Sequence, residues 1–425
     1  MKTFSRSPFK RSSGSRGYTG FMRNQARMAF LGVVLMSNVF AANACTSDAA
    51  HDPVGEAGPS APSPDASEGG GDASTCSAAT VEPVLRSALE SAQRDNRENP
   101  GWLFAVHAPT IGLDFRSAIG TDRATGRALS SDAPFRIASV TKTFVAAAVL
   151  RLVEDGRLGL DAPIGGLLPA PYPSILKDGG YDPDAITVHQ LLAHTSGLYD
   201  YAQTDAYVEA VFSEPTHVWT REEQVRFAMT HGKPVGKPGE VFEYSDTGYV
   251  LLGAIIETIT GKGLAAALRE LDRFEALGLT HTWLETLEPA PADAQPRAPQ
   301  TYGGVPLTTI DASSDLWGGG GLVSTVHDVE AFFRALFGGR VFSKPETLTT
   351  MLTRTAASEP GALGIFTKEI EGTTCFYHEG FWGILSLHCP ALDLGIVTVG
   401  MEAQKLGDGA AELVRPALRA VRDCR

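Results

Sequence analysis

The stretch from Val140 to Glu154 places the strongest constraint on how this chain folds. Its alanines and its β-branched and long apolar side chains occupy all sides of a helical projection, and Asp155-Gly156 follows as a helix end. A helix that is apolar all round is stable only when other elements cover it on every side. We therefore expect a buried central helix with Ser139 at its start.

Strand patterns lie before and after this helix in the sequence. They fall at 102–107, 113–119, and about 363–370, 374–379, 383–389 and 394–400. Helical spacing predicts further helices at 81–95 and 410–421, and residues 157–320 are mainly helical in pattern. The order indicates an α+β fold: one antiparallel sheet flanked by its terminal helices, plus an inserted all-helical subdomain at roughly 157–320.

Ser139 and Lys142 stand three residues apart at the start of the central helix. This spacing puts both side chains on one helix face, within reach of each other. A serine hydroxyl is a weak nucleophile until a base removes its proton, and a lysine becomes such a base when burial lowers its pKa. The helix N-terminus also favours a developing alkoxide over an ammonium ion. The pair therefore predicts a serine nucleophile and its base.

The pattern Ser-x-x-Lys is not specific, because it occurs three times in the chain. Ser7 to Lys10 lies in the N-terminal leader. Ser174 to Lys177 lies between a proline and Asp-Gly-Gly, which predicts a loop with an exposed, protonated lysine. Only the pair at Ser139 opens a buried helix, so we assign the chemistry to that pair.

The residues around the pair read Phe135-Arg136-Ile137-Ala138-Ser139-Val140-Thr141-Lys142. This block resembles the active-site block of class C β-lactamases and D-alanyl-D-alanine carboxypeptidases. The resemblance covers roughly residues 80 to 425 and implies a β-lactamase-like serine hydrolase domain over 79–425. It also implies two further motifs.

The second family motif is Tyr-x-Asn on a loop before a helix. Tyr244-Ser245-Asp246 stands before the apolar run 249–260, with aspartate in place of asparagine. The resemblance implies that Tyr244 acts as general acid or base together with Lys142, and that Asp246 lies at the substrate. The alternative is that Ser245 or Asp246 caps the following helix.

The third family motif is Lys-Thr-Gly, or His-x-Gly, on the sheet edge that faces the nucleophile. His378-Glu379-Gly380 ends a predicted strand. The resemblance implies that the N–H groups of Phe381 and Ser139 form an oxyanion hole, and that Gly380 leaves room for the substrate. A structural, hydrogen-bonded His378 is the alternative, and we interpret His194 as a structural residue at a helix end.

Both departures from the family pattern add a carboxylate, at Asp246 and at Glu379. If Glu379 faces the nucleophile, a substrate carboxylate meets a like charge, which costs on the order of 1 kcal/mol or more. On that condition we expect neutral esters, or peptides with a free amine, to compete well with D-Ala-D-Ala termini and penicillins.

The N-terminus has the pattern of an export signal. Residues 1–44 hold seven Lys or Arg and no Asp or Glu, and they end in an apolar run of about 13 residues before Ala42-Asn-Ala44. Cys45 follows small residues, as at a lipoprotein cleavage site. Two alternatives therefore stand: cleavage with lipidation of Cys45, and cleavage without it. Residues 45–78 are rich in Ser, Pro and Gly and predict a disordered linker.

Charge and cysteines fit an exported protein. Removing the seven leader cations from a net charge of −13 leaves about −20, which repels nucleic acid. Four further cysteines predict disulfides, with Cys375–Cys389 across a hairpin and Cys76–Cys424 between the domain ends as the pairing we favour. Free buried thiols are the alternative.

The sequence lacks the motifs of other classes of hydrolase. The chain has no Gly-x-Ser-x-Gly, no His-x-His and no His-Glu-x-x-His, so we expect neither an α/β-hydrolase, nor a metal site, nor a cofactor. The favoured function is a D-alanyl-D-alanine carboxypeptidase-like or penicillin-binding hydrolase that works through an acyl-enzyme.

Two alternatives remain: an esterase or D-aminopeptidase of the same fold, and a non-catalytic relative that binds or senses peptidoglycan. The expected partner is a small-molecule or peptide substrate, with peptidoglycan as one candidate, and membrane contact arises only through a lipid anchor. The expected location is the bacterial cell envelope or periplasm, or the medium after secretion.

Overall fold

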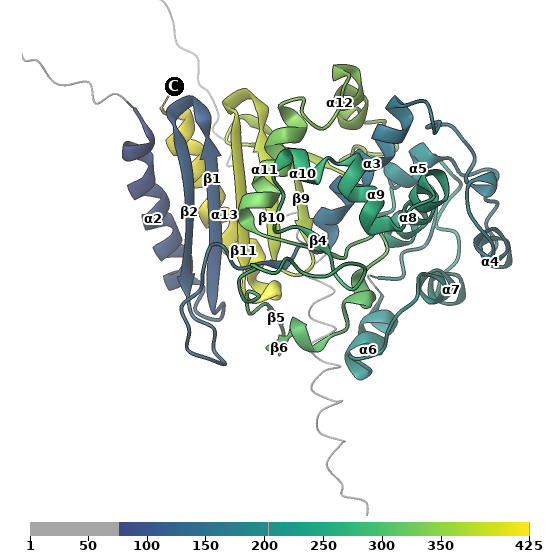
Figure 1. Cartoon of the computed structure of the whole chain (residues 1–425), viewed down its shortest axis with the longest axis horizontal. Coiled ribbons are helices and arrows are strands. Elements are labelled where there is room, and N and C mark those ends of the chain that lie inside the picture. The colour runs from purple at the N-terminus through teal and green to yellow at the C-terminus, as the bar shows by residue number, and fades with distance from the viewer. Residues whose placement is uncertain (1–75, 203, 425) are drawn as a thin grey trace, which may run out of the picture.

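The computed structural model describes residues 76–202 and 204–424 (Figure 1). The expected signal peptide at 1–44, the candidate lipidation site Cys45 and the linker through residue 75 lie outside the described residues.

A six-stranded antiparallel sheet forms one half of the fold, in the order β2-β1-β11-β10-β9-β8. The N-terminal hairpin pairs with the last strand, so the first and last strands of the described residues lie next to each other inside the sheet. This confirms the predicted strands at both ends of the domain. Their bounds are β1 Gly101–Ala108, β2 Leu113–Gly120, β8 Phe366–Ile370, β9 Thr373–Gly380, β10 Ile384–Cys389 and β11 Leu394–Gly400.

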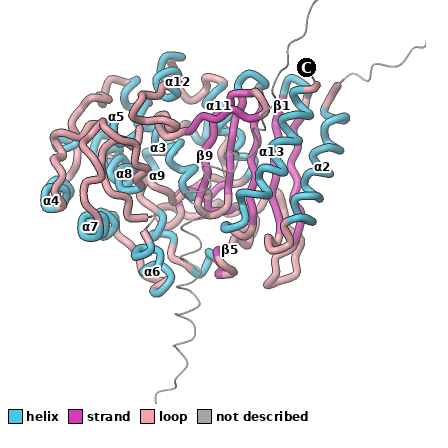
Figure 2. The backbone as a smooth tube through the Cα atoms, turned by 180° about the vertical axis from the view of Figure 1, so that it is seen from behind, coloured by secondary structure: helices cyan, strands magenta, loops and turns pink. Residues whose placement is uncertain are grey.

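The two faces of the sheet are covered by different helices. The terminal helices α2 (Ala78–Asp95) and α13 (Leu406–Arg422) lie side by side over one face, as predicted (Figure 2). Alternate strand residues such as Phe104 and Leu385 pack under them. Helix α11 (Val326–Phe337) covers the opposite face, next to β10 and β11.

The predicted central helix is confirmed as α3 (Thr141–Glu154), which is buried throughout from Thr141 to Leu150. Helices α8 (Asp246–Thr260), α9 (Leu264–Leu271) and α12 (Pro345–Leu352) pack around it. Such burial on all sides is the reason for its uniformly apolar composition. The helix begins after a single 3-10 turn, Ala138–Val140, which contains Ser139.

The remaining α-helices of the described residues all fall between α3 and α11 in the sequence. They are α4 (Tyr172–Asp178), α5 (Val188–Leu192), α6 (Asp205–Ser213), α7 (Arg221–His231) and α10 (Phe274–Leu277). Among the described residues, no single helix has the length and apolar composition to cross a membrane. Helices α8 and α9 have that length and composition only when they are taken together, and an 80° bend separates them.

The all-helical description of 157–320 is wrong in one respect, because this region also contributes strands. β4 (Trp283–Leu284) joins β3 (Phe135–Arg136) and β7 (Leu322–Ser324) in a small sheet, and β5 (Thr301–Tyr302) pairs with β6 (Val305–Pro306). Two-residue strands leave no alternating pattern in the sequence, so the prediction missed them.

The rejected pair Ser174 and Lys177 lies on a helix, α4, and not in the loop that we expected. Lys177 is 59% exposed and lies 3.9 Å from Asp184. Its side chain is in contact with solvent, unlike the fully buried Lys142 of the pair at Ser139.

Both favoured disulfides are present. Cys76–Cys424 joins the start of α2 to the end of α13, with Cα atoms 5.1 Å apart, and Cys375–Cys389 crosses from β9 to β10, with Cα atoms 4.2 Å apart. The first links the ends of the two helices that cover one face of the sheet.

Candidate functional site

The turn that carries Ser139 is held in an unusual backbone conformation. The Ile137 N–H donates to the Leu322 carbonyl oxygen at 3.0 Å, which continues the pairing of β3 with β7. Ala138 has φ +45°, a value that is uncommon for a residue with a side chain. Strain of this kind is typical of functional sites, where the surrounding structure holds it in place.

Lys142 is fully buried and its ammonium group has three acceptors. Nζ lies 3.0 Å from Ser139 Oγ, 2.6 Å from Asp246 Oδ1 and 2.6 Å from the Gly319 carbonyl oxygen. Three acceptors match the three N–H bonds of an ammonium group. The predicted serine–lysine contact is therefore present, and it includes an ion pair with Asp246.

Asp246 lies at the start of α8 but does not cap it. The cap is Ser245, whose Oγ accepts from the Gly248 N–H at 3.2 Å. Of the two capping alternatives, the one for Ser245 is thus confirmed and the one for Asp246 is wrong. The Asp246 carboxylate is free to turn inward to Lys142 because its neighbour satisfies the helix end.

Tyr244 lies against the same lysine. Nζ of Lys142 is 4.8 Å from the centre of the Tyr244 ring, and the His194 ring stacks on that ring at 4.4 Å. Burial and the charge of Asp246 raise the pKa of Tyr244 well above its ordinary value, and a hydrogen bond to Ser139 opposes the shift. Tyr244 is therefore a neutral phenol beside the nucleophile.

His378 faces this group from β9. Its Nδ1 lies 2.7 Å from the carbonyl oxygen of Glu379 and so carries the proton, which leaves the Nε2 lone pair as an acceptor. Nε2 is buried without a hydrogen-bond partner among the described residues. Burial and the charge of Lys142 lower the pKa of His378 to about 3, so this imidazole is neutral.

Gly380 brings the end of β9 against the turn before Ser139. A Cβ atom at Gly380 would lie 2.4 Å from the Ile137 carbonyl oxygen and 3.2 Å from the Ala138 Cβ. Only glycine fits such an approach to backbone. The approach brings Gly380, which directly precedes Phe381, next to the Ser139 turn.

Glu379 points away from this group, which corrects the expectation that it repels a substrate carboxylate. Successive residues of a strand face opposite sides, and His378 faces the site. Cys375 and Tyr377, which share the face of Glu379, belong to the cluster under α2 and α13, and the cation that acts on Glu379 is Lys368 of β8. The repulsion argument therefore fails.

The position of Glu379 has a consequence for stability. Burial raises its pKa to about 7 from an ordinary value of 4.5, although Lys368 opposes the shift. The folded state then binds a proton more tightly than the unfolded chain, so this carboxyl lowers stability as pH rises from about 4.5 to 7. Glu379→Gln should be more stable than wild type at pH 8, by on the order of 1 to 3 kcal/mol, and no different at pH 4.

Urea unfolding at both pH values measures this difference, with the exposed Glu90→Gln as control. A Glu379→Gln protein that gains nothing at pH 8 would contradict the buried position. Because Glu379 faces away from Ser139, the Glu379→Gln variant should have the same preference among substrates as wild type.

The sequence alone did not reveal several contributors to the site. His194 is the helix-end residue that we expected, and its Nδ1 accepts from the Ser245 N–H at 3.0 Å, but it also supports the Tyr244 ring. Gly319 supplies a carbonyl acceptor to Lys142. Asp315 receives the Trp382 indole N–H at 2.8 Å. The signal available in the sequence was that residues 191–198, which include His194, and residues 319–324, which include Gly319, resemble further blocks of the same family. Asp315 lies outside both blocks.

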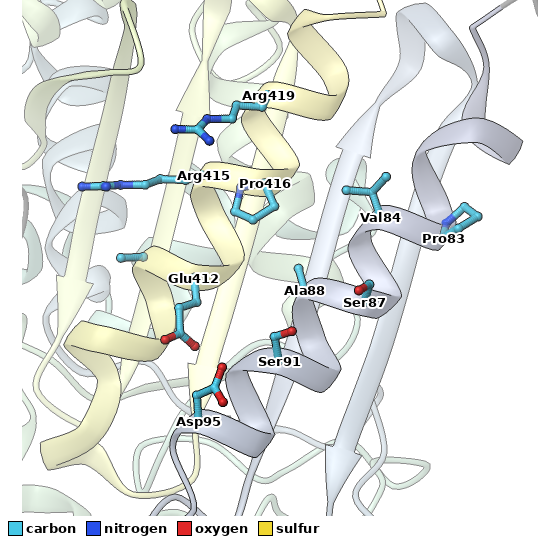
Figure 3. Close-up of a pocket in the computed structure, with 11 residues that line it drawn as sticks. Pro83, Val84, Ser87, Ala88, Ser91, Asp95, Glu412, Arg415, Pro416 and Arg419 are labelled. Carbon is cyan, nitrogen blue, oxygen red and sulfur yellow. The ribbon is translucent and has the colours of Figure 1, made fainter.

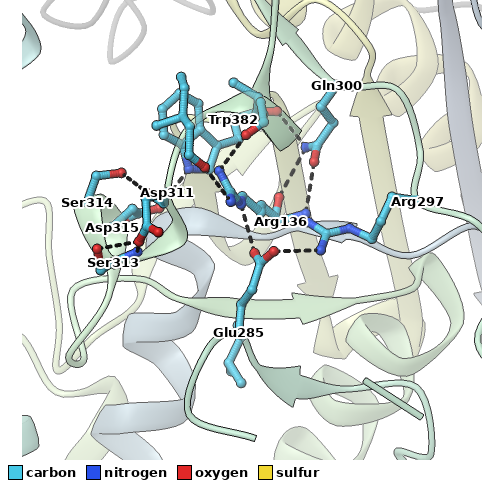
Figure 4. A network of polar contacts seen from close by, with 12 residues as sticks. Arg136, Glu285, Arg297, Gln300, Asp311, Ser313, Ser314, Asp315 and Trp382 are labelled. Carbon is cyan, nitrogen blue, oxygen red and sulfur yellow. Dashed lines mark hydrogen bonds and ion pairs between the residues drawn. The ribbon is translucent and has the colours of Figure 1, made fainter. Parts of the chain in front are cut away.

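A network of polar contacts surrounds Arg136, which stands three residues before Ser139 in the sequence (Figure 4). Arg136 pairs with Glu285 at 2.8 Å, and Glu285 pairs with Arg297 at 3.0 Å. Burial alone would raise the pKa of Glu285, but these two guanidinium groups lower it below its usual value. Burial and the charge of Asp246 raise the pKa of Asp315 to about 7, although Lys142 and Trp382 oppose the shift.

A hollow of about 830 Å³ lies between α2 and α13, on the other side of the sheet (Figure 3). Val84, Ala88, Arg415 and Pro416 are among its lining residues, none of which belongs to the group around Ser139. Within residues 76–202 and 204–424, no three His, Cys, Asp or Glu side chains are arranged to hold a metal ion.

The chain is similar to several known proteins. A profile of the Beta-lactamase family matches residues 101–418. Esterase EstB of Burkholderia gladioli is 35% identical over 218 residues, covering 50% of this chain and 54% of EstB. Penicillin-binding protein 4 of Amycolatopsis lactamdurans is 31% identical over 244 residues, covering 52% of this chain and 59% of that protein. The chain thus spans little more than half the length of these curated relatives.

Solved structures match over a larger share. D-amino acid amidase from Ochrobactrum anthropi SV3, complexed with D-phenylalanine, has a TM-score of 0.67 and 27% identity, covering 81% of this chain and 99% of that chain. A D-stereospecific amidohydrolase from Streptomyces sp. has a TM-score of 0.65 and 26% identity, covering 76% of this chain and 96% of that chain.

Proposed function

Because this chain belongs to the β-lactamase family of serine hydrolases, we propose that it cleaves an ester or amide bond through a covalent acyl intermediate on Ser139. The observation that carries the proposal is the contact of Ser139 Oγ with the buried Lys142 Nζ at 3.0 Å, beside the protonated phenol of Tyr244. A nucleophile, a base and an acid are thus within reach of one another.

Acylation begins when Ser139 Oγ bonds to the substrate carbonyl carbon and gives its proton to Lys142. The lysine accepts that proton because one of its own passes to Asp246 Oδ1, 2.6 Å away. The lysine–aspartate pair thereby gains one positive charge, which balances the negative charge that develops on the carbonyl oxygen. The N–H groups of Ser139 and Phe381 stabilise that oxyanion.

The leaving group then needs a proton. Tyr244 supplies it and recovers one from Lys142, whose ammonium group lies over its ring. A phenol with a raised pKa keeps its proton until the departing oxygen or nitrogen becomes basic, which suits a general acid. Water attack on the acyl-enzyme repeats these steps in reverse, with the neutral His378 Nε2 available as an acceptor.

The charges around Ser139 favour substrates that have no carboxylate. Lys142 is paired with Asp246, and Arg136 is paired with Glu285, so neither of these cations is available to bind a substrate carboxylate. Neutral esters, and D-amino-acid amides, which carry a free amine but no carboxylate, are the substrates that fit this arrangement. EstB and the D-amino acid amidase support this choice among the relatives.

A second candidate is a D-alanyl-D-alanine carboxypeptidase-like or penicillin-binding hydrolase, supported by the likeness to penicillin-binding protein 4. Hydrolysis of nitrocefin, a D-Ala-D-Ala peptide, a D-amino-acid amide and p-nitrophenyl butyrate separates the candidates. Faster turnover of the amide or the ester supports the first candidate. A preference for the peptide or nitrocefin would support the second, and failure of every substrate would refute the hydrolase proposal.

Export is also part of the proposal. Removal of residues 1–44, with or without acylation of Cys45, would release a domain whose two disulfides suit an oxidising compartment. We place the end of the linker at residue 75 and the start of the domain at Cys76, three residues earlier than the sequence suggested, because Cys76 is bonded to Cys424 and α2 begins at Ala78.

An exposed aromatic ring beside the proposed oxyanion donors predicts a preference among esters. Phe381 is 37% exposed, and its ring stacks on Tyr302 at 5.0 Å, which in turn packs on Phe212 at 5.3 Å. An aromatic contact is worth about 0.5 to 1.5 kcal/mol beyond its area. We expect Phe381→Ala to lower kcat/KM for p-nitrophenyl phenylacetate about threefold to tenfold more than for p-nitrophenyl acetate.

The matched control is Val84→Ala, an exposed apolar residue on α2 that should leave the ratio between the two esters unchanged. Equal losses on both esters in Phe381→Ala would show that the ring supports the turn and does not contact the substrate.

A further inference from the structure

Gln300 is a buried side chain between two segments that are far apart in the sequence (Figure 4). Its Oε1 accepts from the Arg136 N–H at 2.8 Å, and its Nε2 donates to the Arg136 carbonyl oxygen at 3.1 Å. The same Nε2 donates to the Trp382 carbonyl oxygen at 2.8 Å. One primary amide thus holds the backbone of both segments, with both of its N–H bonds in use.

These two segments lead to the proposed oxyanion donors. Arg136 ends β3, three residues before Ser139, and Trp382 directly follows Phe381. Gln300 has hydrogen bonds to both segments but lies outside the group of side chains around Lys142. Its place in the site is therefore indirect.

The side chains of Arg136 and Trp382 have hydrogen-bond partners of their own. The Arg136 guanidinium donates to Glu285 at 2.8 Å and to the carbonyl oxygens of Leu307 and Ile310 at 2.9 Å each. Trp382 donates its indole N–H to Asp315 at 2.8 Å. Each segment is thereby anchored to its own surroundings, and the Gln300 amide links the two.

The Ser139 turn needs such support because its backbone is strained. Ala138 has φ +45°, and the end of β9 packs so closely on Ile137 that Gly380 has no room for a Cβ atom. Strained conformations persist only where the surrounding structure over-determines them. Without the link, relaxation of the turn would change the spacing between the two donor groups.

We propose that Gln300 is a positioning residue that sets the geometry of the oxyanion hole, by tying the segment before Ser139 to the segment after Phe381. The inference rests on the proposed function, because it assumes that these two N–H groups bind the oxyanion. Hydrogen-bond donors stabilise a transition state only when they lie in place beforehand, and a displacement of about 1 Å costs up to about 100-fold in rate.

The test compares p-nitrophenyl acetate with its thiono analogue, in which sulfur replaces the carbonyl oxygen. Sulfur is larger than oxygen and is a weaker hydrogen-bond acceptor. Turnover of the thiono ester therefore depends less on the alignment of the two N–H donors of the oxyanion hole. Loss of folded protein lowers both rates by the same factor and cancels in their ratio. The oxo-to-thiono ratio of kcat therefore reports on the hole and not on stability.

Two variants change the amide while keeping its size. Gln300→Met removes the three hydrogen bonds, and Gln300→Glu keeps an acceptor for the Arg136 N–H but sets a carboxylate against two carbonyl oxygens. We expect kcat for the oxo ester to fall at least tenfold in both, with KM within about threefold of wild type, and the oxo-to-thiono ratio to fall at least threefold.

The control is Gln93→Met on α2, where Nε2 donates to the Asn99 carbonyl oxygen at 3.1 Å, beyond the opposite face of the sheet. Its oxo-to-thiono ratio should equal that of wild type. If both Gln300 variants lose activity on the two esters in equal proportion, Gln300 is only structural and the inference is overturned. A wild-type protein that hydrolyses neither ester overturns the proposed function, and the inference with it.

Discussion

Ser139→Ala is expected to hydrolyse esters at least about 1,000-fold more slowly than wild type and to take up no fluorophosphonate probe. The probe reports directly on an activated serine, because it bonds to the oxygen that the base deprotonates. Removing the nucleophile of a serine hydrolase leaves only the residual effect of substrate binding and the oxyanion hole. Mass spectrometry of the intact protein measures the labelling.

The chain offers a matched control for this variant. Ser174 has the same spacing to Lys177 and also lies on a helix, but its lysine is exposed. Ser174→Ala should label and turn over as wild type does. Labelling that survives in Ser139→Ala, or that disappears in Ser174→Ala, would contradict the assignment of the nucleophile.

Lys142→Met is expected to lose at least about 1,000-fold in turnover and to be destabilised at the same time. The substitution leaves the buried Asp246 carboxylate without its cation, and breaking a buried ion pair in this way costs about 3 to 5 kcal/mol. Methionine fills most of the volume of the lysine stem, so the loss is mainly electrostatic. Urea unfolding measures the loss.

The double variant Lys142→Met/Asp246→Asn separates chemistry from stability. Asparagine removes the unpaired charge with little change in shape, so most of the lost stability should return. Turnover should not return, because no base remains for Ser139. Recovery of activity together with stability would show that Lys142 is only structural and that another group activates the serine.

Local patterns in the sequence were sufficient for the parts of this protein that depend on short-range physics. The run 140–154 predicted a buried helix because its residues leave no polar face, and α3 is such a helix. The serine–lysine contact followed from a spacing of three residues, which survives although Ser139 sits in a 3-10 turn.

Motif resemblance located two distant residues, Tyr244 and His378, and the structure brings both to Lys142. The resemblance did not determine in which direction the neighbouring side chains point. Glu379 is adjacent to His378 in sequence, yet strand alternation turns its side chain to the opposite face. Asp246 was expected at the substrate or at the helix cap, whereas its nearest partner is the lysine itself.

The residues that hold the site together left little signal in the sequence. Gln300 contacts positions 136 and 382, and nothing in its neighbourhood marks it as special. The strands that frame the Ser139 turn are two or three residues long, too short to show a period. Contacts between residues that are so far apart in the sequence depend on how the whole domain folds.

By itself, the sequence predicted the buried helix, the strands at both ends, the cysteine pairing that we favoured and the proposed reactive pair. These features rest on periodicity, on spacing within one turn, and on a family block. The tertiary structure alone decided that Asp246 neutralises Lys142, that Glu379 faces away, and that Gln300 joins the two segments of the proposed oxyanion hole. The physical reason is that hydrogen bonds and ion pairs depend on distances of about 3 Å between side chains, and for residues more than 50 positions apart only the packed fold sets those distances.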